Sequence, residues 1–165
     1  MKKLISLILA LAVIATFGVF ALASGEDEGN ASQGSGTVNS ENDTEKLGDY
    51  SVVIDSCRLA KDFEGKDVVI VKYKFTNNEN DNATSFAGAF ENTAYQNGVG
   101  LNESYFLDDN SDYSADNQTK EIKKGASIDV EVAYELNDTT TDIEVEVKEF
   151  ISFSDKTISK TFSIK

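Results

Sequence analysis

The alternation of apolar and polar residues after Gly48 most constrains the fold of this chain. In residues 128–136 the apolar set is Ile128, Val130, Val132, Tyr134 and Leu136, and the charged residues between them are Asp129, Glu131 and Glu135. A period of two with one charged face is typical of an antiparallel strand that covers a core on one side only. We therefore expect these acidic side chains to lie in solvent.

Similar alternation occurs at 50–54, 69–75, 143–148 and 158–164. Turn-forming residues separate these runs, and Asn97-Gly98 is the strongest hairpin signal because both residues tolerate positive φ. The spacing predicts an all-β protein, an immunoglobulin-like antiparallel β-sandwich of about seven to nine strands over residues 48–165, without the Cys…Trp…Cys pattern of antibody domains. Residues 107–119 are polar and are predicted to be an irregular loop.

The first 23 residues have the features of an export signal. Lys2 and Lys3 precede the apolar run 4–23, and Ala21-Leu22-Ala23 fits the small-x-small pattern for cleavage before Ser24. A run of twenty residues, apolar except for Ser6 and Thr16, can also span a bilayer as a helix, so retention as a membrane anchor is the alternative. No cysteine is available near Ser24 for lipid attachment, so we expect a secreted protein.

Residues 24–47 are rich in Gly, Ser, Asn and Glu, and Val38 and Leu47 are their only large apolar residues. Such a segment buries too little apolar surface to offset its ordering entropy, which predicts a disordered linker. It could be a spacer that holds the domain clear of a surface, or a remnant of processing with no role.

Composition excludes several functions. The 165 residues include no His, Trp or Pro and one Cys, and 29 acidic residues outnumber 15 basic ones for a net charge of −14. Without His there is no imidazole metal site and no catalytic triad of the Ser-His-Asp kind. The acidity argues against nucleic acid as a partner. We expect no cofactor and no enzymatic activity.

The order of short motifs resembles a family of exported proteins from Gram-positive bacteria, domain of unknown function 5067. The segments that carry the resemblance are Tyr50–Ile54, Asp62–Lys66, Tyr73–Asn78, Thr84–Phe86, Gln96–Val99, Lys120–Ile122, Ala133–Leu136 and Phe150–Asp155. The resemblance implies an immunoglobulin-like sandwich, often behind a lipoprotein signal, and it brings no activity and no functional residues. This chain departs from the family in lacking the lipobox cysteine and in having Lys124-Gly125 where relatives tend to have Pro-Gly.

Two acidic features could carry chemistry. Residues 108–116 contain Asp108, Asp109, Asn110, Asp112 and Asp116, with the D-x-N-x-D spacing of a calcium loop. It is not an EF-hand, because Tyr113 and Thr119 occupy the glycine and glutamate positions. The acidic rows in 128–136 and 143–149 could supply a carboxylate pair for sugar hydrolysis. Solvation explains both features better, and no metal or catalytic residue is assigned.

Cys57 could be a reactive thiol or form an intermolecular disulfide, and the neighbouring Arg58 would lower the pKa of the thiol if it were exposed. The alternative is a small apolar strand residue, which is the usual behaviour of a lone cysteine.

These observations predict a monomeric, exported, non-catalytic binding or structural module of the cell envelope. The expected partner is an extracellular protein, peptide or glycan, and a membrane only through an uncleaved signal. A calcium-stabilised domain and a carboxylate-based hydrolase or accessory subunit are the alternatives.

Overall fold

The computed structural model describes residues 44–165 apart from positions 106, 109, 110, 153 and 154. The expected signal peptide, its cleavage residues Ala21, Ala23 and Ser24, and residues 24–43 of the expected linker lie outside the described residues. Within the described part of the chain, no helix is long and apolar enough to cross a membrane.

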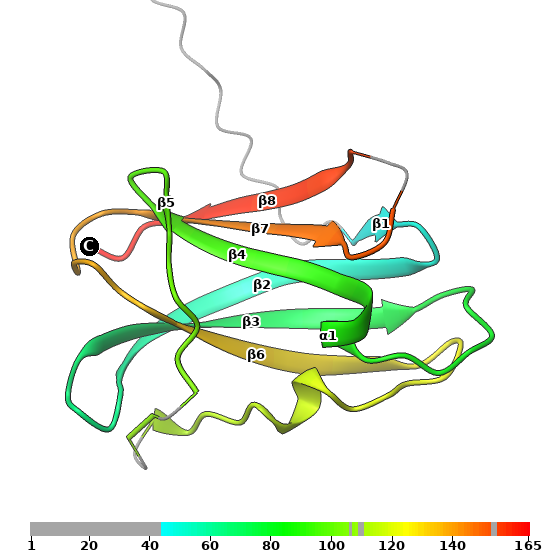
Figure 1. The fold of residues 1–165 in the computed structure, drawn as a ribbon, viewed down its shortest axis with the longest axis horizontal. Helices are drawn as coiled ribbons and strands as arrows, with labels where there is room; N and C mark the ends of the chain where they lie inside the picture. Colours follow the sequence, from blue (N-terminus) through cyan, green and yellow to red (C-terminus); the bar gives the residue numbers. More distant parts are fainter. Residues whose placement is uncertain (1–43, 106, 109–110, 153–154) are drawn as a thin grey trace, which may run out of the picture. The chain divides into compact units, whose positions relative to one another are not determined.

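Two four-stranded antiparallel sheets form this domain (Figure 1), in the orders β1–β2–β3–β6 and β5–β4–β7–β8. The strands are β1 (Glu45–Leu47), β2 (Tyr50–Lys61), β3 (Asp67–Asn77), β4 (Phe90–Gln96), β5 (Val99–Gly100), β6 (Ser127–Glu135), β7 (Ile143–Glu149) and β8 (Thr157–Phe162). The helical segments are α1 (Phe86–Ala89) and the 3₁₀ helix η2 (Asp116–Gln118).

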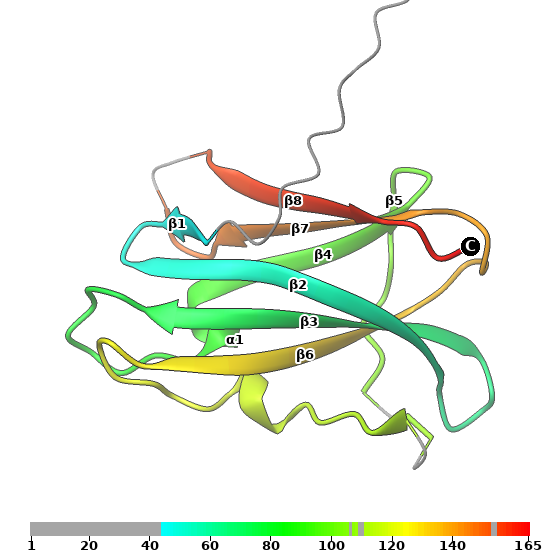
Figure 2. The same cartoon turned by 180° about the vertical axis from the view of Figure 1, so that it is seen from behind.

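The order of the strands is that of the immunoglobulin fold. β3 neighbours β6 in the first sheet, and β4 neighbours β7 in the second, so the chain crosses between sheets three times. Strands B and E, and strands C and F, are neighbours in the same way in immunoglobulin domains. The views from both sides show the first sheet stacked on the second (Figures 1 and 2), which confirms the predicted β-sandwich.

Alternate residues of both sheets form the core. The buried set includes Val52, Ile54, Val69, Val71, Tyr73, Phe75, Val130, Val132 and Tyr134 from the first sheet and Ala94, Ile143, Val145, Val147 and Ile158 from the second. Helix α1 adds Phe86, whose ring centroid lies 5.1 Å from that of Tyr73 and 5.5 Å from that of Phe90. The alternation therefore identified the inner faces of β2 (up to Ile54), β3, β6, β7 and β8 correctly.

The predicted hairpin is present at Asn97-Gly98. The φ angles are 51° and 74°, so both residues are in the left-handed region that a two-residue type I′ turn requires. The turn joins β4 to β5, with Gln96 paired to Val99.

Strand β1 lies inside the segment that was expected to be a linker. Its residues pair with Tyr50–Val52, and the Leu47 side chain is buried in the core. Gly48, at a φ of 58°, makes the tight turn between the two strands. Residues 45–47 are therefore ordered because a single apolar side chain and a glycine turn suffice to add a short edge strand.

Candidate binding groove

The outer face of the first sheet is covered by the connection between β5 and β6. Val68 and Ile70 of β3 are fully buried, yet they alternate with Val69 and Val71 and so point away from the core. The described residues of 101–118 (101–105, 107–108 and 111–118), which we call the strap, pass over this face. Burying an aliphatic side chain of this size contributes about 2 kcal/mol, so the strap is part of the folded structure.

The backbone of the strap follows the free edge of β6. The Ser104 amide donates to the Ala133 carbonyl at 2.8 Å, and the Glu135 amide donates to the Asn102 carbonyl at 2.9 Å. The strap then crosses to the end of β2, where the Asp108 amide donates to the Lys61 carbonyl at 3.0 Å.

At its C-terminal end the strap comes back to the edge of β6, where side-chain amides bind carbonyl groups of that strand. Asn117 Nδ2 donates to the Asp129 carbonyl at 2.8 Å, and Gln118 Nε2 donates to the Glu131 carbonyl at 2.6 Å. An immunoglobulin constant domain has strand D at this edge. Here an irregular segment takes its place, and it protects an edge that could otherwise pair with another chain.

Arg58, the single arginine of the sequence, fastens the strap to the sheet. Its guanidinium donates to the Asp112 carbonyl at 2.9 Å, to the Ser111 carbonyl at 3.5 Å and to both carboxylate oxygens of Glu131. The hydrogen bond to Glu131 and the charges of Glu131 and Asp112 raise the pKa of Arg58. The expectation that Glu131 lies in solvent is therefore wrong, because the strap and Arg58 leave its side chain only 21% exposed.

A chain of polar contacts connects the centre of the core with the strap. The hydroxyls of Tyr73 and Tyr134 lie 3.2 Å apart, and Asn92 Nδ2 donates to the Tyr134 hydroxyl at 2.6 Å and lies 3.5 Å from Glu103. Tyr105 donates to the other oxygen of Glu103 at 2.5 Å. Burial raises the pKa of Tyr134 to about 12 and that of Tyr73 well above its usual range, so both tyrosines stay protonated. They hold β4, the core and the strap together as neutral hydrogen-bonding groups.

A groove opens beside the strap, with a volume of about 880 Å³. Its lining residues are Phe63, Tyr105, Leu107, Asp108, Ser111, Asp112, Tyr113, Ser114, Ala115 and Asp116. Phe63, on the turn between β2 and β3, is 67% exposed, and Tyr105 is 61% exposed.

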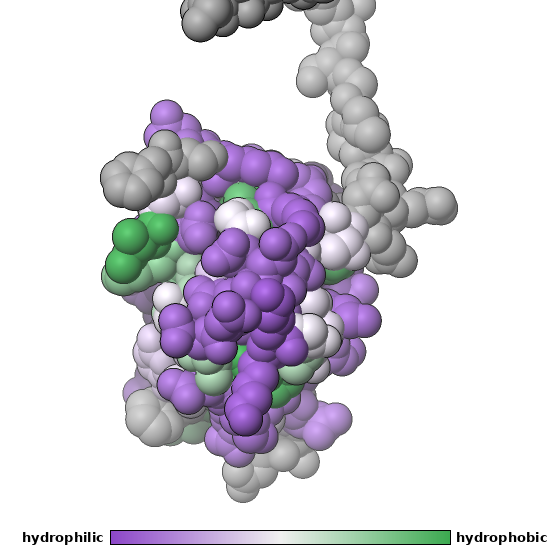
Figure 3. All heavy atoms as spheres, turned by 90° about the vertical axis from the view of Figure 1, so that its right-hand side faces the viewer, coloured by the Kyte–Doolittle hydropathy of each residue, from purple (hydrophilic) through white to green (hydrophobic). Residues whose placement is uncertain are grey.

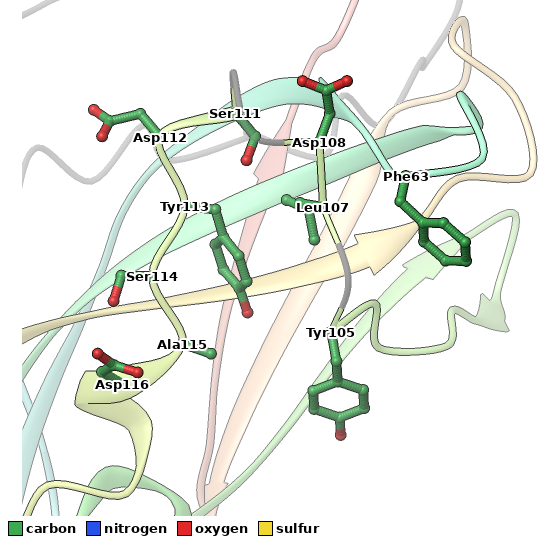
Figure 4. Close-up of a pocket in the computed structure, with 10 residues that line it drawn as sticks. All are labelled: Phe63, Tyr105, Leu107, Asp108, Ser111, Asp112, Tyr113, Ser114, Ala115 and Asp116. Atoms are coloured by element: carbon green, nitrogen blue, oxygen red, sulfur yellow. The ribbon is translucent and has the colours of Figure 1, made fainter.

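The aromatic rings of the groove and the carboxylates of Asp108 and Asp112 point in different directions (Figure 4). The side chains of Leu107 and Tyr113 point into the space between the two limbs of the strap, whereas the Tyr105 ring points out of the end of this space and the Phe63 ring lies across the limb that carries Leu107 (Figure 4). The carboxylates of Asp108 and Asp112 point away from these rings. The groove thus offers ring surfaces with negative charge along one rim.

Asp108 and Asp112 of the expected calcium loop belong to this acidic rim. Asp109 and Asn110 lie outside the described residues, and the described ones contain no group of three acidic or cysteine side chains placed to hold a metal ion. The carbonyls of Ser111 and Asp112, which could serve as ligands, accept hydrogen bonds from Arg58 instead.

The two acidic rows are not brought together. Asp129 and Glu131 lie on the outer face of the first sheet, whereas Glu144 and Glu146 alternate with core residues of β7 in the second sheet. They project from opposite faces of the sandwich, so they cannot flank one glycosidic bond as a carboxylate pair must.

Cys57 is half-buried on β2 and packs against the core. Burial raises the pKa of its thiol, an effect that the charge of Lys160 partly offsets. The thiol is therefore held in its neutral, weakly nucleophilic form, as expected for a small apolar strand residue rather than a reactive one.

The sequence did contain a signal for the covered outer face. Val68–Val71 form a continuous apolar run, which indicates a strand buried on both faces rather than on one. No comparable signal marked Arg58 as the residue that fastens the strap, or Phe63 and Tyr105 as exposed rings of one groove.

Two solved structures resemble the domain at TM-scores just above one half. A candidate lipoprotein from Bacillus subtilis, YcdA, has a TM-score of 0.56 and 20% sequence identity over 75% of this chain. A candidate lipoprotein from Staphylococcus aureus has a TM-score of 0.52 and 24% identity over 74% of this chain and 92% of its own. The match spans only 39% of the Bacillus protein. At this identity the likeness shows a shared fold.

No curated protein matches the sequence significantly. The family model described as domain of unknown function (DUF5067) matches residues 26–149. This range includes the strands up to β7, the strap and all the sequence motifs except Phe150–Asp155. The chain therefore belongs to the DUF5067 family.

Proposed function

We propose that this protein is an exported, non-catalytic module of the cell envelope that binds a positively charged segment of an extracellular protein or peptide. The observation that carries the proposal is the groove, where the exposed rings of Phe63 and Tyr105 adjoin an acidic rim. Aromatic faces and carboxylates together suit a lysine or arginine side chain, through cation–π contact and ion pairing.

Charge supports a basic partner over a neutral glycan. The whole chain has a net charge of −14, which raises the rate of encounter with a cationic ligand at low ionic strength. Binding of a basic segment should weaken as salt screens these charges, whereas binding of a neutral sugar should depend little on salt.

A non-catalytic role is supported by the residues available. The chain has no histidine, and the acidic rows of β6 and β7 lie on opposite faces. Asn117 and Gln118 of the strap and Glu131 of β6 are occupied in holding the fold.

The test of the groove is a calorimetric titration with a ten-residue peptide of alternating lysine and serine, and with an all-serine peptide of the same length. We expect Phe63→Ala to weaken binding of the basic peptide about threefold, since an exposed cation–π contact contributes about 0.5–1 kcal/mol. Phe150→Ala is the matched control, because Phe150 is 63% exposed outside the groove. Equal effects of the two substitutions, or equal binding of both peptides, would contradict the proposal.

For export, we propose cleavage after Ala23 with release, and retention of residues 4–23 as a membrane anchor is the alternative. The fold shared with two candidate lipoproteins supports a role at the envelope. N-terminal sequencing of the protein from the medium and from the membrane fraction decides between a chain that begins at Ser24 and one that keeps Met1.

A further inference from the structure

The second half of strand β2 forms an open edge of the first sheet. Strand β1 pairs only with Tyr50–Val52 at the start of β2, whereas β3 pairs with β2 as far as Lys61. The end of the domain that carries β1 has a mostly hydrophilic surface (Figure 3), and there the edge of β2 is already paired. We call residues 56–60, which lie beyond β1, the open edge. They extend over about 13 Å.

The ladder between β2 and β3 determines which backbone groups face the open edge. The Asp62 amide donates to the Lys66 carbonyl at 3.0 Å, across the hairpin that follows β2. Residues of an antiparallel strand bond to their partner strand and face the other side alternately. Cys57 and Leu59, at odd spacings from Asp62, therefore direct their amides and carbonyls away from β3. Within the described part of the chain, no backbone group pairs with either residue from that side.

The protein itself closes both ends of the open edge. At one end, Lys160 of β8 donates to the Ile54 and Asp55 carbonyls at 2.9 and 2.7 Å. At the other end, the Lys61 carbonyl accepts a hydrogen bond from the Asp108 amide at 3.0 Å. An extension of β1 along β2 would have to displace Lys160. The open edge is thus available to a separate segment rather than to a longer β1, whereas the free edge of β6 is covered by the strap.

A hollow of about 490 Å³ lies along the open edge. Ala60 belongs to the outer face of the sheet and Leu59 to the inner face, and both line the hollow, so it reaches round the strand from one face to the other. This is the position that a further strand of the sheet would take. Asp108 and Ser111 line both the hollow and the groove, so the two spaces meet at the strap. The complete lining set is Arg58, Leu59, Ala60, Lys61, Asp67, Asp108 and Ser111.

The charged groups beside the open edge favour a basic occupant. Acidic residues lie at both of its ends, Asp55 at one and Asp108 at the other. With a net charge of −14, the chain repels a second copy of itself and attracts a basic segment. The basic residues nearby are already engaged by acidic groups or carbonyls: Arg58 by Glu131, Lys61 by Asp67, Lys72 by Asp129, and Lys160 by the carbonyls of Ile54 and Asp55.

We infer that the basic segment bound in the groove continues along the open edge as an added β-strand, with its backbone paired to Cys57 and Leu59. An extended polypeptide supplies amides and carbonyls in the alternation that this edge presents. Its side chains then project alternately over Leu59, which is 48% exposed, and toward the strap. The inference rests on the proposed function, because one peptide occupies both the groove and the open edge.

Hydrogen exchange tests the inference in the unmodified protein. The probe is the ten-residue peptide of alternating lysine and serine, at a saturating concentration set by calorimetry, and the exchange of single amides is measured by NMR. We expect the amides of Cys57 and Leu59 to exchange at least tenfold more slowly when the peptide is bound. The amides of Arg58 and Ala60, which face β3, should change much less.

A proline substitution tests the same pairing from the side of the protein. Leu59→Pro removes an outward amide without removing a bond to β3, and proline is tolerated on an edge strand where its N–H would face solvent. We expect it to weaken binding of the peptide about fivefold, the effect of one lost hydrogen bond. Leu59→Ala, which keeps the amide, should weaken binding less than twofold. Circular dichroism checks that both variants are folded, and the exchange experiment decides if Leu59→Pro is not.

The outcomes separate this inference from the proposed function. Peptide binding without slower exchange at Cys57 and Leu59 would overturn the inference and leave the proposed function intact, as would equal affinities of the two folded Leu59 variants. Failure of the peptide to bind would overturn both. Slow exchange of the two amides without peptide would also overturn the inference. A dependence of that slow exchange on protein concentration would identify a second copy as the occupant, and independence would identify a segment of the same chain.

Discussion

The inner and outer faces of β6 differ in how they are buried. On the inner face, Val130, Val132 and Tyr134 are all buried in one apolar core. On the outer face, Ala133 is fully buried, Glu131 is half-buried and ion-paired, and Asp129 is exposed. The inner face is apolar along the strand, with Ile128 half-buried at its start, because it packs into the core between the sheets. The outer face changes along the strand because the strap covers only part of it.

The largest effect should come from a charge placed on the inner face. Val130→Asp puts a carboxylate into the core without a partner, so we expect a loss of several kcal/mol of unfolding free energy, enough to unfold a domain of ordinary stability. Thermal denaturation followed by circular dichroism measures this. Val99→Asp makes the same change at an exposed position of β5 and should cost under about 0.5 kcal/mol. Similar melting temperatures for both variants would show that Val130 is not in the core.

An intermediate effect is expected where the strap is fastened to the outer face. Arg58→Ala removes the donors to the strap carbonyls and leaves Glu131 half-buried without its ion pair, so we expect a loss of about 2 kcal/mol. Hydrogen exchange should accelerate at the amides of Ser104 and Asp108, while the amides between β3 and β6 stay protected. Arg58→Lys should recover less than half of the loss, because an ammonium group cannot reproduce the fork of donors.

The control for this variant lies on the same face. Lys72→Ala removes an exposed ion pair with Asp129, at 2.9 Å, and should change stability by under about 0.5 kcal/mol. If Lys72→Ala and Arg58→Ala had equal effects on the exchange of the strap amides, Arg58 would not be what fastens the strap.

A smaller difference is expected between neighbouring acidic residues of β6. Glu131→Gln removes the charge of a residue that binds Arg58, and we expect it to cost about 1 kcal/mol. Asp129→Asn makes the equivalent change at an exposed position and should cost under about 0.5 kcal/mol. Urea denaturation of the two variants resolves this difference, and equal costs would mean that the strap does not alter the environment of Glu131.

These cases show what the alternation in the sequence can predict. It identified the strands and their inner faces, because a two-residue period depends only on one side being apolar. It also led to the belief that every charged residue between core residues is solvated, which fails at Glu131. Whether an outer face is covered depends on a distant segment, and Arg58 and Ser111 are brought together only by the fold.

The groove, too, could not be predicted from local sequence patterns. Phe63 and Tyr105 are 42 positions apart in the sequence and neither belongs to an alternating run, so nothing local indicated that they share one site. In the sequence, the acidic residues of 108–116 indicated a possible calcium loop. The position of Asp108 and Asp112 at the rim of an aromatic groove followed only from the course of the strap.

The smallest effect should come from calcium. The positive charge of Arg58 already occupies the carbonyls of Ser111 and Asp112, so the protein itself provides the cation that a metal would supply to this part of the outer face. We expect the melting temperature to differ by less than about 1 °C between millimolar calcium and a chelator, because a ligand stabilises a protein only when it binds the native state. Scanning calorimetry in both conditions measures this. A rise that grows with calcium concentration and is lost in Asp112→Asn would instead show that the loop binds the ion, and that the strap is held by a metal as well as by Arg58.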